Sequence, residues 1–182
     1  MKHPARWIAS VAALAIVALA VVLATQVGND PRADSTTSRL AGKDAPRFRV
    51  TTLDGEQLTR ADLAGKATIV NFWNTWCIPC REEASSLQEF YERHADDADF
   101  QMIGIVRDDT RSAVQRWVRN RGDEWTIAMD PGGKAALAFG TRGQPETFAI
   151  SPDGLIVGYK FGPSSVRDLE ALLVAARGGN GA

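Results

Sequence analysis

The sequence predicts an α/β fold with a mixed central sheet flanked by helices and an added N-terminal β-hairpin. In the first half, Ala67–Trp73 and Phe100–Val106 read as strands on either side of an amphipathic segment, which is a strand-helix-strand unit. In the second half, Glu146–Ile150 and Leu155–Phe161 flank the turn residues Pro152–Gly154 and precede another amphipathic segment. A strand-helix-strand half joined to a strand-strand-helix half makes a mixed sheet between helices.

The elements ahead of the first long strand form the expected hairpin. Phe48–Thr52 and Glu56–Leu58 are short strand patterns joined by Asp54–Gly55, a pair favoured in tight turns. Ala67–Trp73 is then almost continuously apolar, with β-branched and aromatic residues. Such a run is typical of a strand that is covered on both faces.

Helical periodicity accounts for most of the remaining segments. Apolar residues recur at helical spacing after the first long strand, again around Val114–Arg121, and near the C-terminus. Asp109 or Thr110 is the expected cap of the middle helix, and Ser165 of the last one. Trp125–Met129 reads as a short strand and Gly133–Phe139 as a helical stretch.

The N-terminus carries a pattern typical of a membrane anchor. Lys2 and Arg6 precede Ile8–Ala24, a 17-residue apolar run with a single serine, and such a run can cross a bilayer as a helix. Basic residues on the short N-terminal flank favour a cytoplasmic N-terminus. We therefore expect a transmembrane signal-anchor at residues 1–27 and a single-pass protein of the cell membrane whose catalytic domain lies on the extracytoplasmic side. A removed signal peptide is the alternative, since Ala18–Ala20 resembles a cleavage site.

Composition divides the rest of the chain into a linker, one domain and a tail. Residues 28–46 are rich in small and polar residues, which is typical of a flexible linker, and residues 177–182 read as a disordered tail. The intervening residues 47–176 have the usual size of a single domain. With 21 basic and 22 acidic residues, the chain has no basic excess, so we expect no nucleic-acid partner.

The most informative motif is the pair Cys77 and Cys80, the only cysteines in the chain. The same spacing serves as half of a zinc site, but the only histidines are His3 and His94, so a second half is missing. A structural staple is another alternative. Reversible thiol-disulfide chemistry explains the spacing best, and we expect neither a metal nor a cofactor beyond the redox-active disulfide itself.

The motif lies between a buried strand and a helix, and this position suits a reactive thiol. Amides and the positive dipole end of the helix favour the thiolate, which is the nucleophilic form. Cys77 is then the nucleophile and the more exposed sulfur, and Cys80 is the buried resolving thiol. In an oxidising compartment a dithiol reductant must be recharged by a partner.

Three segments carry a resemblance to a known family. Asn71–Glu83 resembles the strand-to-helix motif of thioredoxin-like proteins, particularly the membrane-anchored TlpA, ResA and CcmG (DsbE) group. Gly42–Phe48 is similar to the opening segment of that group, and Phe139–Ile150 to its second landmark. The resemblance covers most of residues 42–176 and implies that residues 47–176 form a thioredoxin-like domain.

Residues other than the two cysteines are also expected to contribute to the site. By the resemblance, Pro145 is a cis-proline that faces the disulfide, and the backbone of Gln144 is expected to pair with an extended substrate segment. Trp76 is expected to line the apolar rim on which substrate docks. Asn71 stands where cytosolic thioredoxins carry a buried aspartate, so another acid must manage the proton of Cys80. Glu146 is our catalytic candidate, whereas we expect Glu82 and Glu83 on the helix surface.

The resemblance further implies the biological role. It suggests a protein-disulfide reductase that acts on the haem-binding cysteines of apocytochrome c during cytochrome c biogenesis, with a membrane electron donor of the DsbD or CcdA type. An exported oxidase that introduces disulfides into secreted proteins is the alternative within the same chemistry. A copper-binding assembly factor of the Sco type is the alternative from another class, although that group generally uses Cys-x-x-x-Cys and a distant histidine. A peroxidase fits less well, because the thiols lack the Thr-x-x-Cys context.

Overall fold

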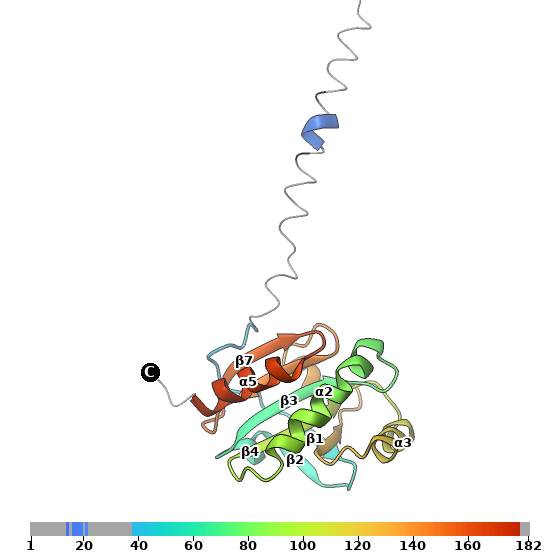
Figure 1. Cartoon of the computed structure of the whole chain (residues 1–182), viewed down its shortest axis with the longest axis vertical. Helices are drawn as coiled ribbons and strands as arrows, with labels where there is room; N and C mark the ends of the chain where they lie inside the picture. Colours follow the sequence, from blue (N-terminus) through green and yellow to red (C-terminus); the bar gives the residue numbers. More distant parts are fainter. Residues whose placement is uncertain (1–13, 15, 20, 22–37, 179–182) are drawn as a thin grey trace, which may run out of the picture. The chain divides into compact units, whose positions relative to one another are not determined.

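The computed structural model describes residues 14, 16–19, 21 and 38–178 (Figure 1). Contacts divide the chain into two units, residues 1–35 and residues 36–182, and the second unit holds the fold. Of the predicted domain boundaries, the one at residue 27 lies outside the described residues. The division into anchor, linker, domain and tail therefore stays a prediction.

A seven-stranded mixed sheet forms the centre of the second unit, in the order β2-β1-β5-β4-β3-β6-β7. Strand β3 lies inside the sheet, where it pairs in parallel with β4 and antiparallel with β6. Every residue of β3 is buried, as expected for a strand with helices or loops on both faces. The strands are β1 Arg49–Thr52, β2 Gln57–Thr59, β3 Ala67–Trp73, β4 Phe100–Val106, β5 Thr126–Met129, β6 Glu146–Ile150 and β7 Ile156–Phe161.

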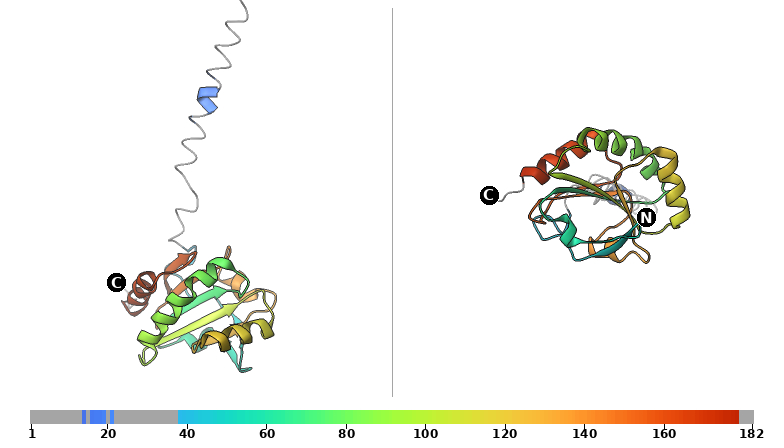
Figure 2. Two further views of the ribbon diagram at one scale, coloured as in Figure 1. Left: turned by 45° about the vertical axis from the view of Figure 1, so that its right-hand side comes forward. Right: turned by 90° about the horizontal axis from the view of Figure 1, so that it is seen from below.

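Three helices cover one face of this sheet. They are α2 (Ile78–His94), α3 (Arg111–Arg121) and α5 (Val166–Gly178), which form an arc across the sheet with α2 between α5 and α3 (Figure 2). One apolar cluster joins α2, α3 and α5 to the sheet, and Phe90 of α2 and Leu173 of α5 are among its buried members. Packing on the sheet, rather than helix propensity alone, stabilises these helices.

The opposite face is covered by shorter pieces. Residues 38–48, the 3₁₀ helix η1 (Arg60–Leu63) and the five-residue helix α4 (Lys134–Ala138) pack there against a second apolar cluster. Phe72 of β3 lies at its centre, with the rings of Phe139 and Phe148 at centroid distances of 5.2 and 5.8 Å. Full-length helices therefore cover one face of the sheet, as expected, whereas only short elements cover the other face.

The predicted fold class is confirmed. The ends of the predicted strands each agree with the observed ends to within one residue. Thr110 caps α3, because its Oγ1 accepts a hydrogen bond from the backbone amide of Ala113. The pattern did not reveal that the N-terminal hairpin joins the main sheet. Strand β1 pairs antiparallel with β5, so the hairpin extends the edge of the sheet.

The predicted membrane location is contradicted. Within the described residues, the structure contains no helix with enough length and apolar character to span a bilayer. Such a helix needs about 20 consecutive apolar residues, and of the run Ile8–Ala24 the structure describes only residues 14, 16–19 and 21. We therefore withdraw the single-pass location with an extracytoplasmic domain.

Candidate active site

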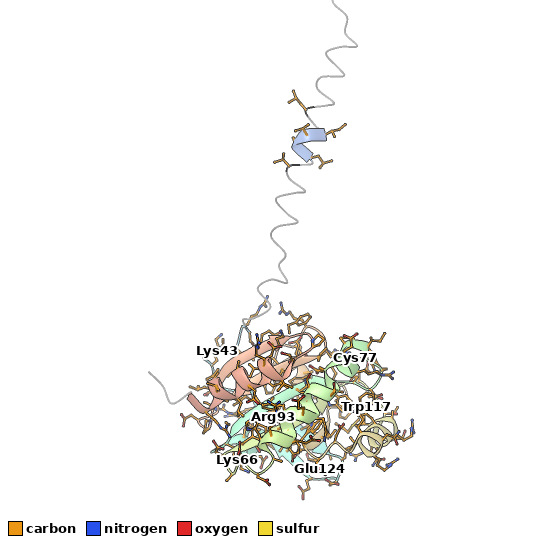
Figure 3. The ribbon with its side chains drawn as sticks, in the orientation of Figure 1. Lys43, Lys66, Cys77, Arg93, Trp117 and Glu124 are labelled. Atoms are coloured by element: carbon orange, nitrogen blue, oxygen red, sulfur yellow. A yellow bond between two sulfur atoms is a disulfide. The ribbon has the colours of Figure 1, made fainter. Side chains whose placement is uncertain are left out.

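The two cysteines form a disulfide at the point where β3 passes into α2. Cys77 is the N-cap of the helix, and its Sγ accepts a hydrogen bond from the backbone N–H of Cys80 at 3.2 Å. Pro79 lies in the first turn, where a missing amide hydrogen costs no intrahelical bond. A first-turn amide aimed at Sγ stabilises negative charge on that sulfur. The geometry therefore favours Cys77 as the thiolate, and Figure 3 labels Cys77 beside the end of α2.

Both sulfur-bearing residues are buried in the disulfide form, Cys77 with 4% and Cys80 with 3% of its surface exposed. Cys77 was expected to be the more exposed of the two, and in the disulfide form the two differ by only one percentage point. Two apolar side chains beside the disulfide are exposed instead, Trp76 at 53% and Ile78 at 70%. An apolar rim around a buried reactive pair suits contact with another protein.

The loop between β3 and the disulfide is held by the β4–α3 connection. The backbone N–H and the hydroxyl of Thr75 both donate to Asp109 Oδ2, at 2.8 and 2.7 Å. Trp76 Nε1 donates to the carbonyl of Asp108 at 2.7 Å, which fixes the indole on the rim. Arg81 Nε donates to the carbonyl of Thr75 at 2.7 Å from the other side. These bonds hold the loop in place before any substrate binds.

A second loop reaches the disulfide from far along the sequence. The Gln144–Pro145 peptide bond is cis, and the Gln144 carbonyl oxygen lies 3.8 Å from Cys77 Sγ. Pro145 itself is buried, whereas Gln144 is half-buried. The structure thus brings together four predicted site residues: Cys77, Cys80, Gln144 and Pro145.

Glu146, the predicted proton acceptor, is fully buried at the start of β6. Its Oε1 accepts hydrogen bonds from the backbone amides of Arg142 and Gly143, at 2.5 and 2.8 Å, and its Oε2 accepts one from the Tyr159 hydroxyl at 2.8 Å. The carboxylate therefore closes the loop that ends in the cis-proline. Its role in proton transfer stays a prediction.

Glu83 is the buried acid that the sequence analysis missed. It is 1% exposed, so its expected place on the helix surface is wrong, although its neighbour Glu82 is exposed as expected. Glu83 Oε1 accepts a hydrogen bond from Asn71 Nδ2 at 2.9 Å, and Oε2 accepts one from the backbone N–H of Ser164 at 2.8 Å. Burial raises the pKa of Glu83 to about 7, and the two hydrogen bonds only partly oppose this effect.

A signal for this burial was present in the sequence. Glu83 lies three residues after Cys80 and four before Leu87, so it falls in phase with the buried stripe of α2. A carboxyl group whose pKa is close to neutrality, on the same helix face as the resolving thiol, can exchange the proton of Cys80. Asn71, which replaces the aspartate of cytosolic thioredoxins, holds this carboxyl group in place.

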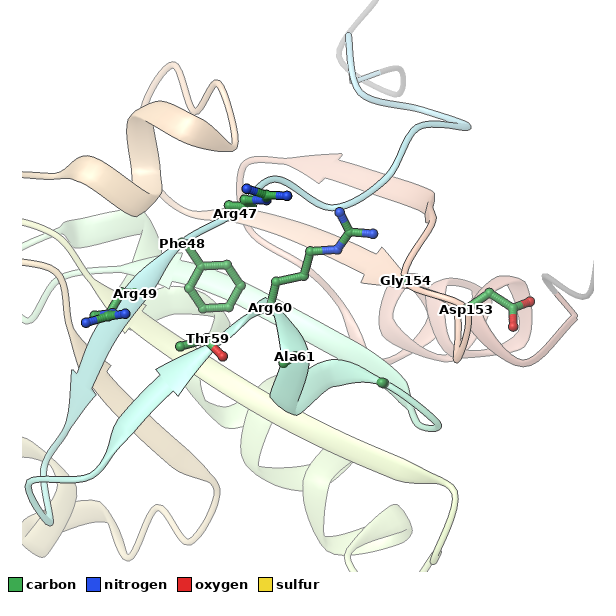
Figure 4. A pocket seen from close by; sticks show the side chains of 9 residues that line it. Arg47, Phe48, Arg49, Thr59, Arg60, Ala61, Asp153 and Gly154 are labelled. Carbon is green, nitrogen blue, oxygen red and sulfur yellow. The ribbon is translucent and has the colours of Figure 1, made fainter.

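One described cavity lies away from the disulfide. It has a volume of about 550 Å³ and is lined by Arg47, Phe48, Arg60 and Gly154, among others (Figure 4). None of the residues around the disulfide lines it. Among the described residues, no group of three or more His, Cys, Asp or Glu side chains is arranged to hold a metal ion.

Comparisons with known proteins agree with this geometry. The model of the AhpC/TSA family matches residues 41–159. The chain is 35% identical to the thiol-disulfide oxidoreductase ResA of Bacillus thuringiensis over 132 residues, which cover 72% of this chain and 76% of the relative. It is 34% identical to the thiol:disulfide interchange protein DsbE of Allochromatium vinosum over 150 residues, which cover 81% and 80%. A solved thiol:disulfide interchange protein of the thioredoxin family from Chlorobium tepidum superimposes with a TM-score of 0.64 at 29% identity, covering 78% of this chain and 99% of that one.

Proposed function

Because this chain belongs to the AhpC/TSA family of thioredoxin-like proteins and is a thiol-disulfide oxidoreductase of the ResA and DsbE type, we propose that it reduces disulfides in other proteins. Cys77 is the nucleophile and Cys80 the resolving thiol. The observation that supports these roles best is the hydrogen bond from the Cys80 amide to Cys77 Sγ at the start of α2. That bond favours the anionic form of one sulfur only.

The reaction proceeds through two exchanges of sulfur partners. In the reduced enzyme, the Cys77 thiolate attacks one sulfur of a substrate disulfide, and the other substrate sulfur leaves as a thiolate that takes up a proton. Cys80 then gives up its proton and attacks Cys77 Sγ, which breaks the mixed disulfide and releases the second substrate thiol. Two electrons pass from the enzyme dithiol to the substrate, and the Cys77–Cys80 disulfide forms.

Substrate binding is assigned to the surface around the disulfide. Trp76, which is exposed and fixed by its bond to the Asp108 carbonyl, supplies apolar contact. Gln144 offers backbone groups for pairing with an extended segment, and the ring of Pro145 occupies the space beside the sulfurs. Glu146 and Glu83 are the two candidates for handling the proton of Cys80.

The proposed substrate is apocytochrome c, with its haem-binding cysteines joined as a disulfide. Support comes from the similarity of Asn71–Glu83 and of Phe139–Ile150 to the motifs of the CcmG group. An electron donor of the DsbD or CcdA type would reduce the Cys77–Cys80 disulfide after each turnover. A donor is required because each cycle leaves the enzyme oxidised.

Covalent trapping tests this proposal. The Cys80→Ala variant cannot resolve the mixed disulfide, so it should retain its substrate on Cys77, whereas Cys77→Ala should retain none. A peptide with a disulfide-bonded Cys-x-x-Cys-His segment should be captured by Cys80→Ala and reduced by the reduced wild-type enzyme. Recovery of unrelated proteins without apocytochromes, together with a strongly oxidising reduction potential, would favour the oxidase that introduces disulfides. Tight copper binding by the reduced protein would favour the Sco-like role.

A further inference from the structure

The loop that carries the cis-proline is held by a buried carboxylate rather than by regular secondary structure. Residues 141–145 belong to neither a helix nor a strand, and among their amides Thr141 N–H donates to the Ala136 carbonyl of α4 at 3.0 Å. Two of these amides, Arg142 N–H and Gly143 N–H, donate to the same oxygen of Glu146. The position of the Gln144 carbonyl therefore depends on the orientation of the Glu146 side chain.

Tyr159 of β7 determines that orientation. Its ring packs on Phe148 with centroids 5.0 Å apart, and its hydroxyl donates to Glu146 Oε2 at 2.8 Å. Phe148 pairs with Tyr159 across the strands, so Glu146, two residues earlier on β6, lies on the same face and within reach of the hydroxyl. Burial raises the pKa of Tyr159 to about 12, which keeps the hydroxyl protonated and able to donate.

The hydroxyl oxygen of Tyr159 also accepts a hydrogen bond from a side chain of the loop. Arg142 Nη2 donates to the Tyr159 oxygen at 3.2 Å, and the guanidinium lies 5.2 Å from the centre of the Phe161 ring. The backbone of Arg142 thus bonds to Glu146 while its side chain bonds to Tyr159. One neutral hydroxyl bridges a carboxylate and a guanidinium, and both of these groups hold the loop.

We propose that Tyr159 is a positioning residue for protein substrates: its hydroxyl bridges Glu146 and Arg142 and so holds the Gln144 backbone in the orientation that an extended substrate segment needs. The inference rests on the proposed function, because it assumes that substrate pairs with this loop. It predicts that Tyr159 matters for disulfides within polypeptides. It also predicts no effect on small disulfides, which need only the Cys77 sulfur.

The Tyr159→Phe variant tests the inference, because it keeps the ring against Phe148 and removes only the hydroxyl. Single-turnover oxidation of the reduced enzyme is followed at increasing concentrations of the disulfide-bonded Cys-x-x-Cys-His peptide. We expect the half-saturating peptide concentration to rise about tenfold while the maximal rate changes less than about twofold, since ground-state binding is weakened and the sulfur chemistry is untouched. The rate with hydroxyethyl disulfide should not change. Tyr91→Phe is the matched control, because Tyr91 is the only other tyrosine in the chain and packs on Trp125.

Amide hydrogen exchange and a second variant test the same role of Tyr159. Amide hydrogen exchange at Arg142 and Gly143 should accelerate in Tyr159→Phe and not in Tyr91→Phe. If Tyr159→Phe folds poorly, Arg142→Ala replaces it, because Arg142 is exposed and its side chain supplies the other bond to the hydroxyl. Equal loss of rate with peptide and with hydroxyethyl disulfide, or no change with either, would overturn the positioning role. A wild-type enzyme that reduces hydroxyethyl disulfide but not the peptide would instead refute the proposed function.

Discussion

Replacing Glu83 by glutamine should remove a titration near neutral pH that affects both stability and catalysis. The substitution keeps the size of the side chain and mimics the protonated acid. The glutamine oxygen can still accept from the Ser164 amide, and its NH₂ can donate to the Asn71 carbonyl if that amide turns over. The change therefore tests the charge of Glu83 more than its packing.

The effect on stability follows from the raised pKa. In the folded protein the pKa of Glu83 lies at about 7 instead of the ordinary 4.5, a difference equivalent to about 3 kcal/mol. Between these values the folded state holds a proton that the unfolded state has lost. The stability that this proton contributes is complete below about pH 4.5 and is lost as the pH rises through about 7. The unfolding free energy of Glu83→Gln should therefore equal that of the wild type near pH 4.5 and exceed it by an amount that grows to about 3 kcal/mol near pH 8.

The effect on catalysis concerns the second exchange step. Cys80 must lose its proton before it attacks Cys77, and the Glu83 carboxylate lies on the same buried face of α2. A positioned base of matched pKa accelerates proton transfer, so Glu83→Gln should slow the resolving step at neutral pH on the order of 100-fold. The step can be followed by tryptophan fluorescence in stopped flow, since Trp73 and Trp76 flank the disulfide loop.

The matched control for Glu83→Gln is Glu82→Gln. Glu82→Gln removes an exposed carboxylate one residue away and should change neither the stability profile nor the rate profile. If Glu83→Gln keeps the wild-type inflection near pH 7 in the resolving rate, and the stability difference between acid and alkaline pH is unchanged, then burial does not shift Glu83 as argued. Proton exchange with Cys80 would then fall to Glu146.

Three further predictions concern other parts of the domain. Asp123 is buried, and its Oδ1 lies 3.6 Å from Arg121 Nε, although neither carboxylate oxygen is within hydrogen-bond geometry of a partner among the described residues. Burial raises its pKa to about 6, and the positive charge of Arg121 only partly opposes this. Asp123→Asn should therefore raise the unfolding free energy in urea by about 1–2 kcal/mol at neutral pH, with no gain at acid pH, where the wild-type carboxyl is also uncharged. A Cβ added at Gly104 would lie 2.7 Å from Ile127 Cδ1. Gly104→Ala should therefore lower the unfolding free energy by about 1–3 kcal/mol. An unchanged denaturation midpoint would show that the neighbouring side chains move aside without cost. Trp76→Ala should weaken peptide binding without lowering thermal stability, whereas Leu137→Ala, which removes another exposed apolar side chain, should leave peptide binding unchanged if docking is confined to the disulfide rim.

Local patterns were sufficient for most of the fold. The apolar run Ala67–Trp73 predicted strand β3 with its observed bounds, because a strand buried on both faces needs apolar residues at nearly every position. Of the two expected caps of α3, Asp109 and Thr110, the structure has Thr110, and the pattern could narrow the choice this far because capping depends on a few neighbouring residues. The membrane location was the failure: it was inferred from hydropathy, and no described helix supports it.

The candidate site was predictable only in part. The spacing of Cys77 and Cys80 indicated a redox pair, and the resemblance of the second landmark placed Gln144 and Pro145 beside it. Glu83 was missed although it lies in phase with the buried stripe of α2, because a carboxyl group on a helix is usually solvated. Its burial depends on Ser164, which lies 81 residues further along the chain.

By itself, the sequence determined the elements, their order, and the chemistry that two thiols at a helix start can perform. Each of these follows from interactions between residues close together in the chain. The tertiary structure alone decided which groups surround the sulfurs: the Gln144 carbonyl at Cys77, the buried Glu83 held by Asn71, and the Tyr159 hydroxyl on Glu146. The physical reason is that an acid becomes a proton carrier or a structural tether through its burial and its hydrogen-bond partners, and packing of distant strands and helices sets both.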